Sequence, residues 1–214
     1  MSCWLLSSCQ PSGKNPKFSD PRITANIRYL ESSGELSGTW SFYQRNQVDS
    51  LVPDARLHEF IINGQKVKSE KVKNNYHMYL MNDTLISHNL NVQIQPSNQV
   101  ISIAMPYIPV IESELLQVGL DWTFTWDSLS YNVGDSIRLV LSDSTKKTVL
   151  TNASGQAGQI TIPYTQTRYL TPGSGFYYLI SKSIRRKKTN GVDFEYEIEV
   201  YSDDVPVKIM SWDN

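Results

Sequence analysis

Histidine, a frequent general base and metal ligand in proteins, occurs three times, at His58, His77 and His88. No two of these residues stand in a metal-binding spacing such as His-x-His or His-Glu-x-x-His. Glu59 follows His58, but neighbouring residues of a strand point to opposite faces, so these two side chains are not expected to act together. We therefore expect ordinary surface or core histidines and no metal site.

An alternating acidic row near the C-terminus could be interpreted as paired catalytic carboxylates. It consists of Asp193, Glu195, Glu197 and Glu199. The preceding Asn190-Gly191 predicts a two-residue hairpin turn, because both central residues of such a turn need positive φ. Counting outward from this turn opposes three basic and three acidic residues: Lys188 with Asp193, Arg186 with Glu195, and Lys182 with Glu199. We interpret the row as a solvated sheet face whose charges fix the strand register.

The other face of this predicted hairpin holds a conflict. One strand contributes Phe194, Tyr196, Ile198 and Val200, whereas the other contributes Ser181, Ser183, Arg185 and Lys187. We expect the hairpin tip to project beyond the core, or a bulge to reset the alternation.

Three further motifs favour structural roles. Gly155-Gln-Ala-Gly158 lacks the Lys-Ser/Thr of a phosphate loop and is expected to be a turn. Asp203-Asp204 could bind calcium, although a turn suits it better, and the basic cluster 185–188 could attract phosphates. The sequence nominates no catalytic, cofactor-binding or metal residue. We expect a non-enzymatic protein without a cofactor, with an enzyme of dispersed active site as a further alternative.

The two cysteines, Cys3 and Cys9, precede the body of the chain, which therefore has no cysteine for a disulfide or a zinc site. Leu6-Ser-Ser-Cys9 resembles the lipobox of bacterial lipoproteins, and this resemblance implies lipid attachment at Cys9. Before Cys9 there is no Lys or Arg and a short apolar stretch, Trp4-Leu-Leu6, which a true start further upstream would explain. The alternative is an N-terminal segment whose cysteine has no role.

Period-two alternation of apolar and polar residues, typical of half-buried strands, runs through both halves of the chain. In the first half it predicts strands at 23–29, 39–43, 76–80, 89–95 and 99–104, with a hairpin at Asn63-Gly64 inside 60–67. In the second half it predicts a turn followed by a strand within 133–141, and strands at 147–151 and 159–164. Trp40 and Phe42 share one face, and Leu120, Trp122, Phe124 and Trp126 form a second apolar stripe. We expect both sets in the core, with solvent-facing sugar stacking by the second stripe as the alternative.

Composition limits the possible partners. The 214 residues carry 20 basic and 21 acidic side chains, so there is no basic excess for nucleic acid. Twelve tyrosines and five tryptophans fit strands better than helices.

Two stretches, 21–35 and 122–135, resemble uncharacterised lipoproteins of Bacteroidetes-type bacteria. That resemblance implies a lipobox, a polar tether and two immunoglobulin-like sandwiches. The expected fold is all-β, with two consecutive immunoglobulin-like antiparallel β-sandwich domains. We expect a tether at 1–20, a first sandwich at 21–105, a connector at 106–118 and a second sandwich at 119–214.

The expected function follows from the anchor and the rigid β-modules. We expect a binding or scaffold lipoprotein of the bacterial cell envelope, anchored at the outer membrane through the lipid on Cys9. Its partner would be another envelope protein or a glycan, and the alternative is a carbohydrate-binding module that uses exposed aromatic residues.

Overall fold

The computed structural model describes residues 21–45, 51–54, 58–81, 89–95, 99–111, 116–127, 134–189 and 191–211, and its regular structure is almost entirely β-strand. The strands of the first half are β1 (Arg22–Leu30), β2 (Glu35–Arg45), β3 (Leu51–Pro53), β4 (Glu59–Ile62), β5 (Gln65–Val72), β6 (Asn75–Met81), β7 (Asn89–Gln95) and β8 (Gln99–Ala104). The strands of the second half are β9 (Leu116–Gln117), β10 (Trp122–Thr125), β11 (Ser136–Asp143), β12 (Thr148–Ser154), β13 (Gln159–Ile162), β14 (Gly173–Thr189), β15 (Val192–Tyr201) and β16 (Val205–Met210). Two short helices, η1 (Gly155–Ala157) and α1 (Tyr164–Thr167), lie between strands of the second half, and none of the described helices could span a membrane.

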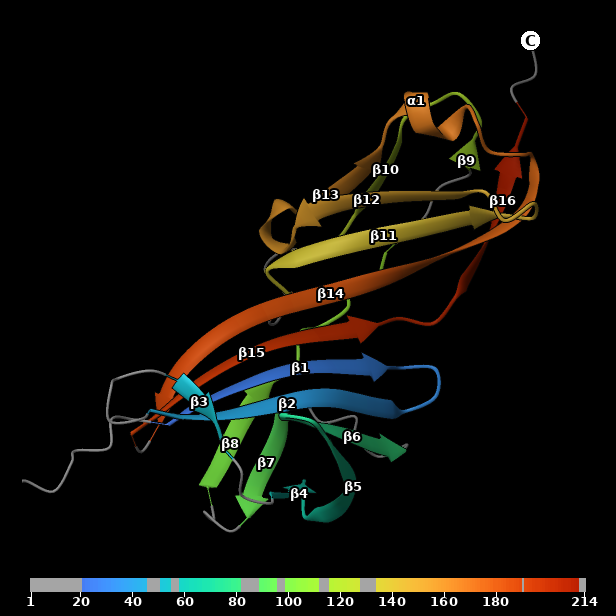
Figure 1. Ribbon diagram of the computed structural model, residues 1–214. Coiled ribbons are helices and arrows are strands. Elements are labelled where there is room, and N and C mark those ends of the chain that lie inside the picture. The colour runs from blue at the N-terminus through green and yellow to red at the C-terminus, as the bar shows by residue number, and fades with distance from the viewer. Residues whose placement is uncertain are drawn as a thin grey trace, which may run out of the picture.

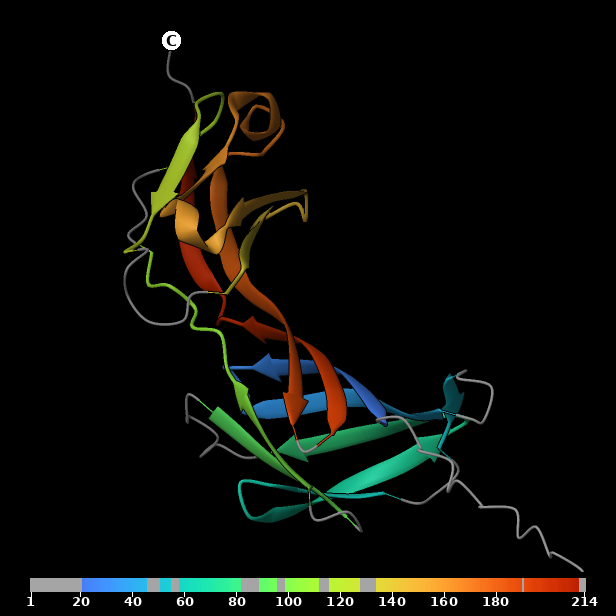
Figure 2. The ribbon, with the colours of Figure 1, turned by 90° about the vertical axis from the view of Figure 1, so that its left-hand side faces the viewer.

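Most described strands belong to one mixed sheet. Its main path runs β12-β11-β14-β15-β1-β2-β6-β5-β4-β7-β8, and β3, β9 and β16 join it at the side. Figure 1 shows the part of this path from β12 to β2 from top to bottom, and Figure 2 shows how the lower part curls until β7 and β8 lie beneath β15, β1 and β2. The lower part is thus a half-barrel, and β10 and β13 form a separate small sheet in the upper part.

The long strand β14 connects the two parts of the sheet. Its first half pairs with β16 and β11, and its second half pairs with β15. β15 in turn pairs in parallel with β1, the first strand of the described chain. The all-β prediction is therefore confirmed, but the sheet is one large mixed half-barrel instead of two clearly separate antiparallel sandwiches.

The parallel pairing of β1 with β15 explains this difference. Each strand buries every second residue, and the register places Ile23 beside Phe194 and Ile27 beside Ile198, so that both apolar faces point into the same core. Such a pairing brings together segments that most of the chain separates, and no local pattern announces it. The domain boundaries at 105/106 and 118/119 stay a prediction.

Aromatic residues fill the half-barrel. Trp40 of β2 has no exposed surface, and its ring centroid lies 5.3 Å from that of Phe60 on β4 and 5.8 Å from that of Phe194 on β15. Trp40 therefore joins two walls of the curled sheet across the core. The prediction that Trp40 and Phe42 share a buried face is confirmed.

The small β10–β13 sheet covers the upper part of the large sheet. Trp122, Phe124 and Trp126 are buried as predicted, and the Phe124 ring lies 5.5 Å from that of Tyr177 on β14. Leu120 does not belong to this stripe: it lies before β10 and is partly exposed, because the strand alternation begins only at Trp122.

The two Asn-Gly hairpin predictions can be compared with the strands. Asn63 and Gly64 both have positive φ, 47° and 84°, and connect β4 to β5 as predicted. In the last hairpin, all three predicted pairs are present, Lys182 with Glu199, Arg186 with Glu195 and Lys188 with Asp193. The pairing runs without a bulge from Ile180 to Thr189. Near the tip, Arg185 and Lys187 of β14 are exposed, whereas Val192 and Phe194 of β15 are buried, so the hairpin tip as a whole does not project beyond the core.

A buried carboxylate fixes the turn between β11 and β12. Asp143 is 2% exposed, and its Oδ1 accepts hydrogen bonds from Thr145 N–H (2.8 Å), Thr145 Oγ1 (2.7 Å) and Lys147 N–H (3.0 Å). Its Oδ2 accepts a bond from Thr171 N–H (2.7 Å), which ties the loop before β14 to this turn. Burial alone would raise the pKa of the Asp143 carboxyl, but these hydrogen bonds outweigh it and hold the pKa well below its usual range.

Candidate functional site

The outer face of the half-barrel carries the acidic row. Val192, Phe194, Tyr196, Ile198 and Val200 of β15 are buried, so the alternating acidic residues necessarily point outward. The interpretation of this row as a sheet face with opposite charges beside it is confirmed for the described ion pairs.

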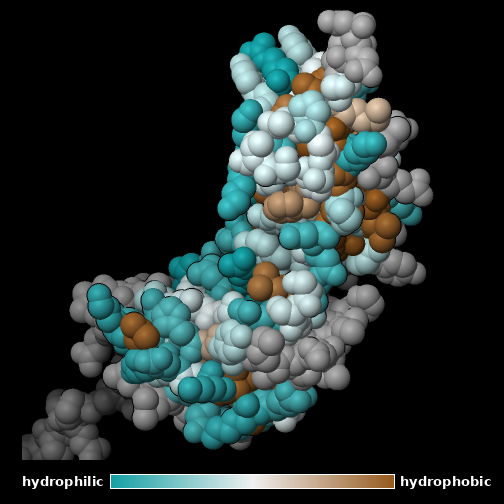
Figure 3. All heavy atoms as spheres, turned by 90° about the vertical axis from the view of Figure 1, so that its right-hand side faces the viewer, coloured by the Kyte–Doolittle hydropathy of each residue, from teal (hydrophilic) through white to brown (hydrophobic). Residues whose placement is uncertain are grey.

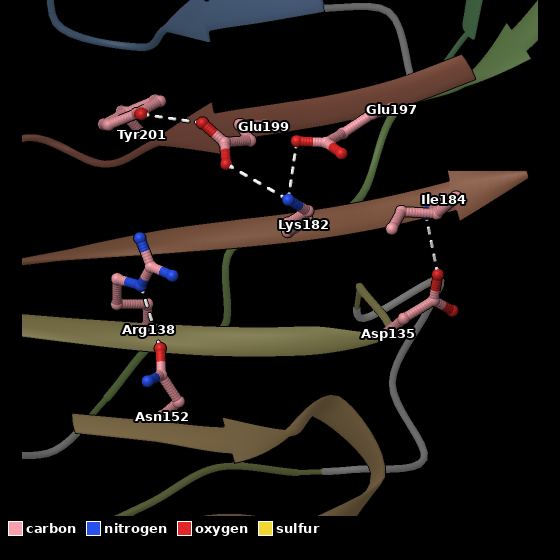
Figure 4. Close-up of polar contacts among 8 residues, drawn as sticks. All are labelled: Asp135, Arg138, Asn152, Lys182, Ile184, Glu197, Glu199 and Tyr201. Atoms are coloured by element: carbon pink, nitrogen blue, oxygen red, sulfur yellow. Dashed lines mark hydrogen bonds and ion pairs between the residues drawn. The ribbon is translucent and has the colours of Figure 1, made fainter. Parts of the chain in front are cut away.

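Basic residues of β14 hold this row from one side. Lys182 Nζ lies 2.5 Å from Glu197 Oε1 and 3.7 Å from Glu199 Oε1, as Figure 4 shows. Arg186 bonds diagonally to Asp193, at 3.2 Å. Each pair is partly solvated, so it fixes the positions of the two side chains more than it stabilises the folded protein.

On its other side, residues of β1 contact the row. The position of β1 beside β15 was not predicted from the sequence. Arg22 Nη2 lies 2.6 Å from Glu195 Oε2. The Arg28 guanidinium lies over the Tyr201 ring, 4.2 Å from its centroid, and the Tyr201 hydroxyl donates a 2.8 Å hydrogen bond to Glu199. Burial, followed by this hydrogen bond, raises the pKa of Tyr201 to about 12, so the phenol stays a donor near neutral pH.

A groove of about 390 Å³ lies beside these ion pairs, over β15, β1, β2 and β6. β2 contributes short outward side chains, Ser37 and Thr39, between longer ones on the neighbouring strands. The His77 ring closes one side, with Nδ1 3.1 Å from Thr39 Oγ1. The polar side chains that line the groove are Asn26, Arg28, Ser37, Thr39, His77, Glu197 and Glu199.

The groove presents balanced charge and many hydrogen-bonding groups. Two carboxylates, Glu197 and Glu199, stand against two cations, Arg28 at the groove and Lys182 at its border. Tyr79 lies directly across from Ser37 on β6 and is 50% exposed, so an aromatic ring borders the same area. This arrangement can bind a polar uncharged group. It suits a cationic ligand less well, because the carboxylates of Glu197 and Glu199 are already paired with Lys182.

A second, smaller cavity of about 240 Å³ contains His58. The imidazole is 6% exposed, stacks on Phe42 at 3.9 Å, and places Nε2 3.4 Å from Asp54 Oδ2. Gln44 donates a 2.9 Å hydrogen bond to the same oxygen. His58 is a core histidine, as expected, and within the described ranges no three His, Cys, Asp or Glu side chains are grouped to hold a metal.

The remaining predicted positions have structural roles or lie outside the described residues. Cys9 and His88 belong to the latter. The indoles of Trp122 and Trp126 donate to backbone oxygens of Gln117 (2.7 Å) and Gly155 (3.0 Å), so the aromatic stripe that motivated sugar stacking lies inside the protein.

The structure also describes the remaining three motifs, two of which lie in connections between strands and one of which lies in a strand. Residues 155–157 form η1, with Gly158 at positive φ, and the basic cluster 185–188 lies at the exposed end of β14. Asp203-Asp204 lies in the exposed connection between β15 and β16.

The chain is a mostly β protein. No family model and no curated protein matches it. Among solved structures it is distantly similar to trypsin-activated alpha-2-macroglobulin from Escherichia coli, with a TM-score of 0.28 and 8% sequence identity. The similarity covers 87% of this chain but 16% of that one, and at this level it carries no information about function. The resemblance to Bacteroidetes-type lipoproteins stays a prediction.

The surface of the half-barrel is mainly polar. In Figure 3, teal and white residues dominate the lower part, and brown residues gather mainly in the upper part. The face shown therefore offers mainly polar contacts over the lower part.

Proposed function

We propose that this chain is a non-enzymatic binding module of the bacterial cell envelope, anchored through Cys9, whose ligand lies in the outer groove. The groove is the observation that carries the proposal, because it combines a volume of about 390 Å³ with side chains that are already oriented by ion pairs and hydrogen bonds. Preorganised polar groups lower the entropy cost of binding.

The same groove favours a carbohydrate as the ligand over another envelope protein. Two positive and two negative groups leave it without net charge, and its hydroxyl, amide and carboxylate groups suit a hydroxyl-rich neutral ligand. The exposed Tyr79 ring supplies the stacking surface that the buried indoles do not. The carbohydrate alternative therefore rests on Tyr79 and no longer on Trp122 and Trp126.

We expect the protein to bind at least one neutral glycan, and we expect Thr39→Trp to weaken that binding about tenfold or more, because the indole would fill the groove. A glycan array followed by titration calorimetry measures both. Thr123→Trp is the matched control, since Thr123 is exposed on β10, away from the groove. Equal binding by the two variants would place the ligand elsewhere and contradict the groove proposal.

The anchor has its own test. In a bacterial host, we expect the full chain in the membrane fraction and the Cys9→Ala variant in the soluble fraction, because one lipid-bearing residue supplies the attachment. Cys3→Ala is the control and should stay with the membrane. The anchor is wrong if Cys9→Ala and the unchanged chain partition alike.

A further inference from the structure

The floor of the outer groove follows a single strand, β2, which lies between β1 and β6 (Figure 1). Trp40 and Phe42 are buried, so Ser41 points outward, as do Ser37 and Thr39. Outward residues of one strand repeat about every 6.7 Å, and these hydroxyl groups therefore form a row about 13 Å long. The groove includes Ser37 and Thr39, and Ser41 continues its floor by one position.

Side chains of β6 line this row on one side. His77 Nδ1 lies 3.1 Å from Thr39 Oγ1, and Ser41 Oγ donates a 2.6 Å hydrogen bond to Asn75 Oδ1. Across from the first hydroxyl of the row lies Tyr79, whose side chain is 50% exposed. Each position of the floor therefore has its own neighbour on β6.

Strand β1 lines the row on the other side. The residues directly across from the floor positions are Arg28, Asn26 and Thr24. Each step along the row thus offers a hydroxyl group of β2 between polar or aromatic side chains of β1 and β6. Hydroxyl and amide groups both donate and accept hydrogen bonds, so a pattern that repeats along a line suits a ligand whose hydroxyl groups also repeat.

The dimensions of the row limit the shape of that ligand. A length of about 13 Å accommodates about three linked sugar rings, whereas a single ring could contact one position only. β1 and β6 lie two strand spacings apart, about 9.6 Å, and their side chains occupy part of this width. An unbranched chain that runs along β2 therefore fits the row better than a compact or branched glycan.

We infer that the groove binds a linear, neutral oligosaccharide that lies along β2, with one ring against Tyr79 and the following rings over Thr39 and Ser41. This inference rests on the proposed function and adds the shape and direction of the ligand. Stacking on Tyr79 supplies an apolar contact at one end, and the hydroxyl and amide groups bind the rest of the chain.

Titration calorimetry with linear β-linked oligosaccharides of glucose, mannose and N-acetylglucosamine, from disaccharide to hexasaccharide, tests this inference. We expect the affinity for at least one of these series to rise about tenfold from the disaccharide to the tetrasaccharide, because each added ring reaches a further preorganised position. Beyond the tetrasaccharide the affinity should level off, since the row ends. Equal affinities for the disaccharide and the tetrasaccharide would overturn the inference.

The variant Ser41→Trp tests the direction of the chain. Its indole covers the far end of the row, so it should abolish most of the gain in affinity between disaccharide and tetrasaccharide. Thr123→Trp, on β10, is the control and should retain the gain. Circular dichroism checks both folds, and the length series of the unchanged protein decides alone if Ser41→Trp does not fold. A Ser41→Trp protein that folds and retains the whole gain contradicts a ligand along β2.

A glycan array separates failure of this inference from failure of the proposed function. If the protein binds only branched glycans on the array, or none of the linear series, the linear ligand is wrong but carbohydrate binding stands. If it binds no glycan of any kind, the proposed function fails and this inference fails with it.

Discussion

Replacing Trp40 with alanine should lower the free energy of unfolding by about 3–5 kcal/mol and shift a single unfolding transition of the whole protein. The indole is fully buried between Phe60 and Phe194, so its removal leaves a cavity between two walls of the half-barrel. Because β14 carries the sheet from this core into the upper part, we expect the upper part to unfold together with it.

Urea unfolding measures this coupling with two probes. With Trp4 and Trp212 replaced by phenylalanine in both proteins, Trp122 and Trp126 report by fluorescence on the upper part after the substitution, and far-ultraviolet circular dichroism reports on all strands. Both midpoints should fall together. Tyr164→Ala, at an exposed residue of α1, is the control and should change the free energy by less than about 0.5 kcal/mol. A fluorescence midpoint that stays at its original value would indicate two independent domains.

Replacing Asp143 with alanine should lower the free energy of unfolding by about 2–3 kcal/mol. The carboxylate accepts four hydrogen bonds, and its loss leaves backbone donors of Thr145, Lys147 and Thr171 without their acceptor. Asp143→Asn should lose less, since the amide retains one accepting oxygen. Thermal and urea unfolding of the three proteins give the order directly, and an alanine variant as stable as the unchanged chain would contradict it.

The same carboxylate predicts the direction of the pH dependence. Its pKa is lower in the folded protein than in the unfolded chain, where it is about 3.9. The folded state therefore binds fewer protons, and the stabilisation is complete above about pH 4 and is lost as the pH falls below it. Asp143→Asn should flatten the decline between about pH 4 and pH 2. Asp204→Asn, at an exposed aspartate, is the control and should leave the decline unchanged.

Local patterns predicted the strands and turns well. Asn63-Gly64 needs a backbone that few other pairs tolerate, so it located its hairpin to the residue. In the β14–β15 hairpin, turn chemistry and opposite charges indicated the same register, and all three residue pairs agree. Leu120 shows the limit of this reasoning, because alternation alone does not say where a strand begins.

Long-range pairing could not be predicted in the same way. The apolar alternation of 22–30 does not indicate that this strand lies parallel to 193–201, since it would suit many neighbouring strands. The candidate site depends on that pairing. The sequence identified the acidic row and its basic partners on β14, but Arg22 and Arg28 reach the row from β1, and the groove needs β2 and β6 as well. The complementary charges of β1 and β15 are the signal that could have suggested it.

The parallel arrangement of β1 and β15 also has a mechanical consequence. The two strands run side by side over nine residue pairs, with the N-terminal segment entering at the start of β1 and the chain leaving at the far end of β15. Tension applied between those two points acts along both strands in opposite directions and loads their hydrogen bonds in shear, all at once. Tension applied at those two points would therefore have to break these bonds together instead of unzipping them one at a time.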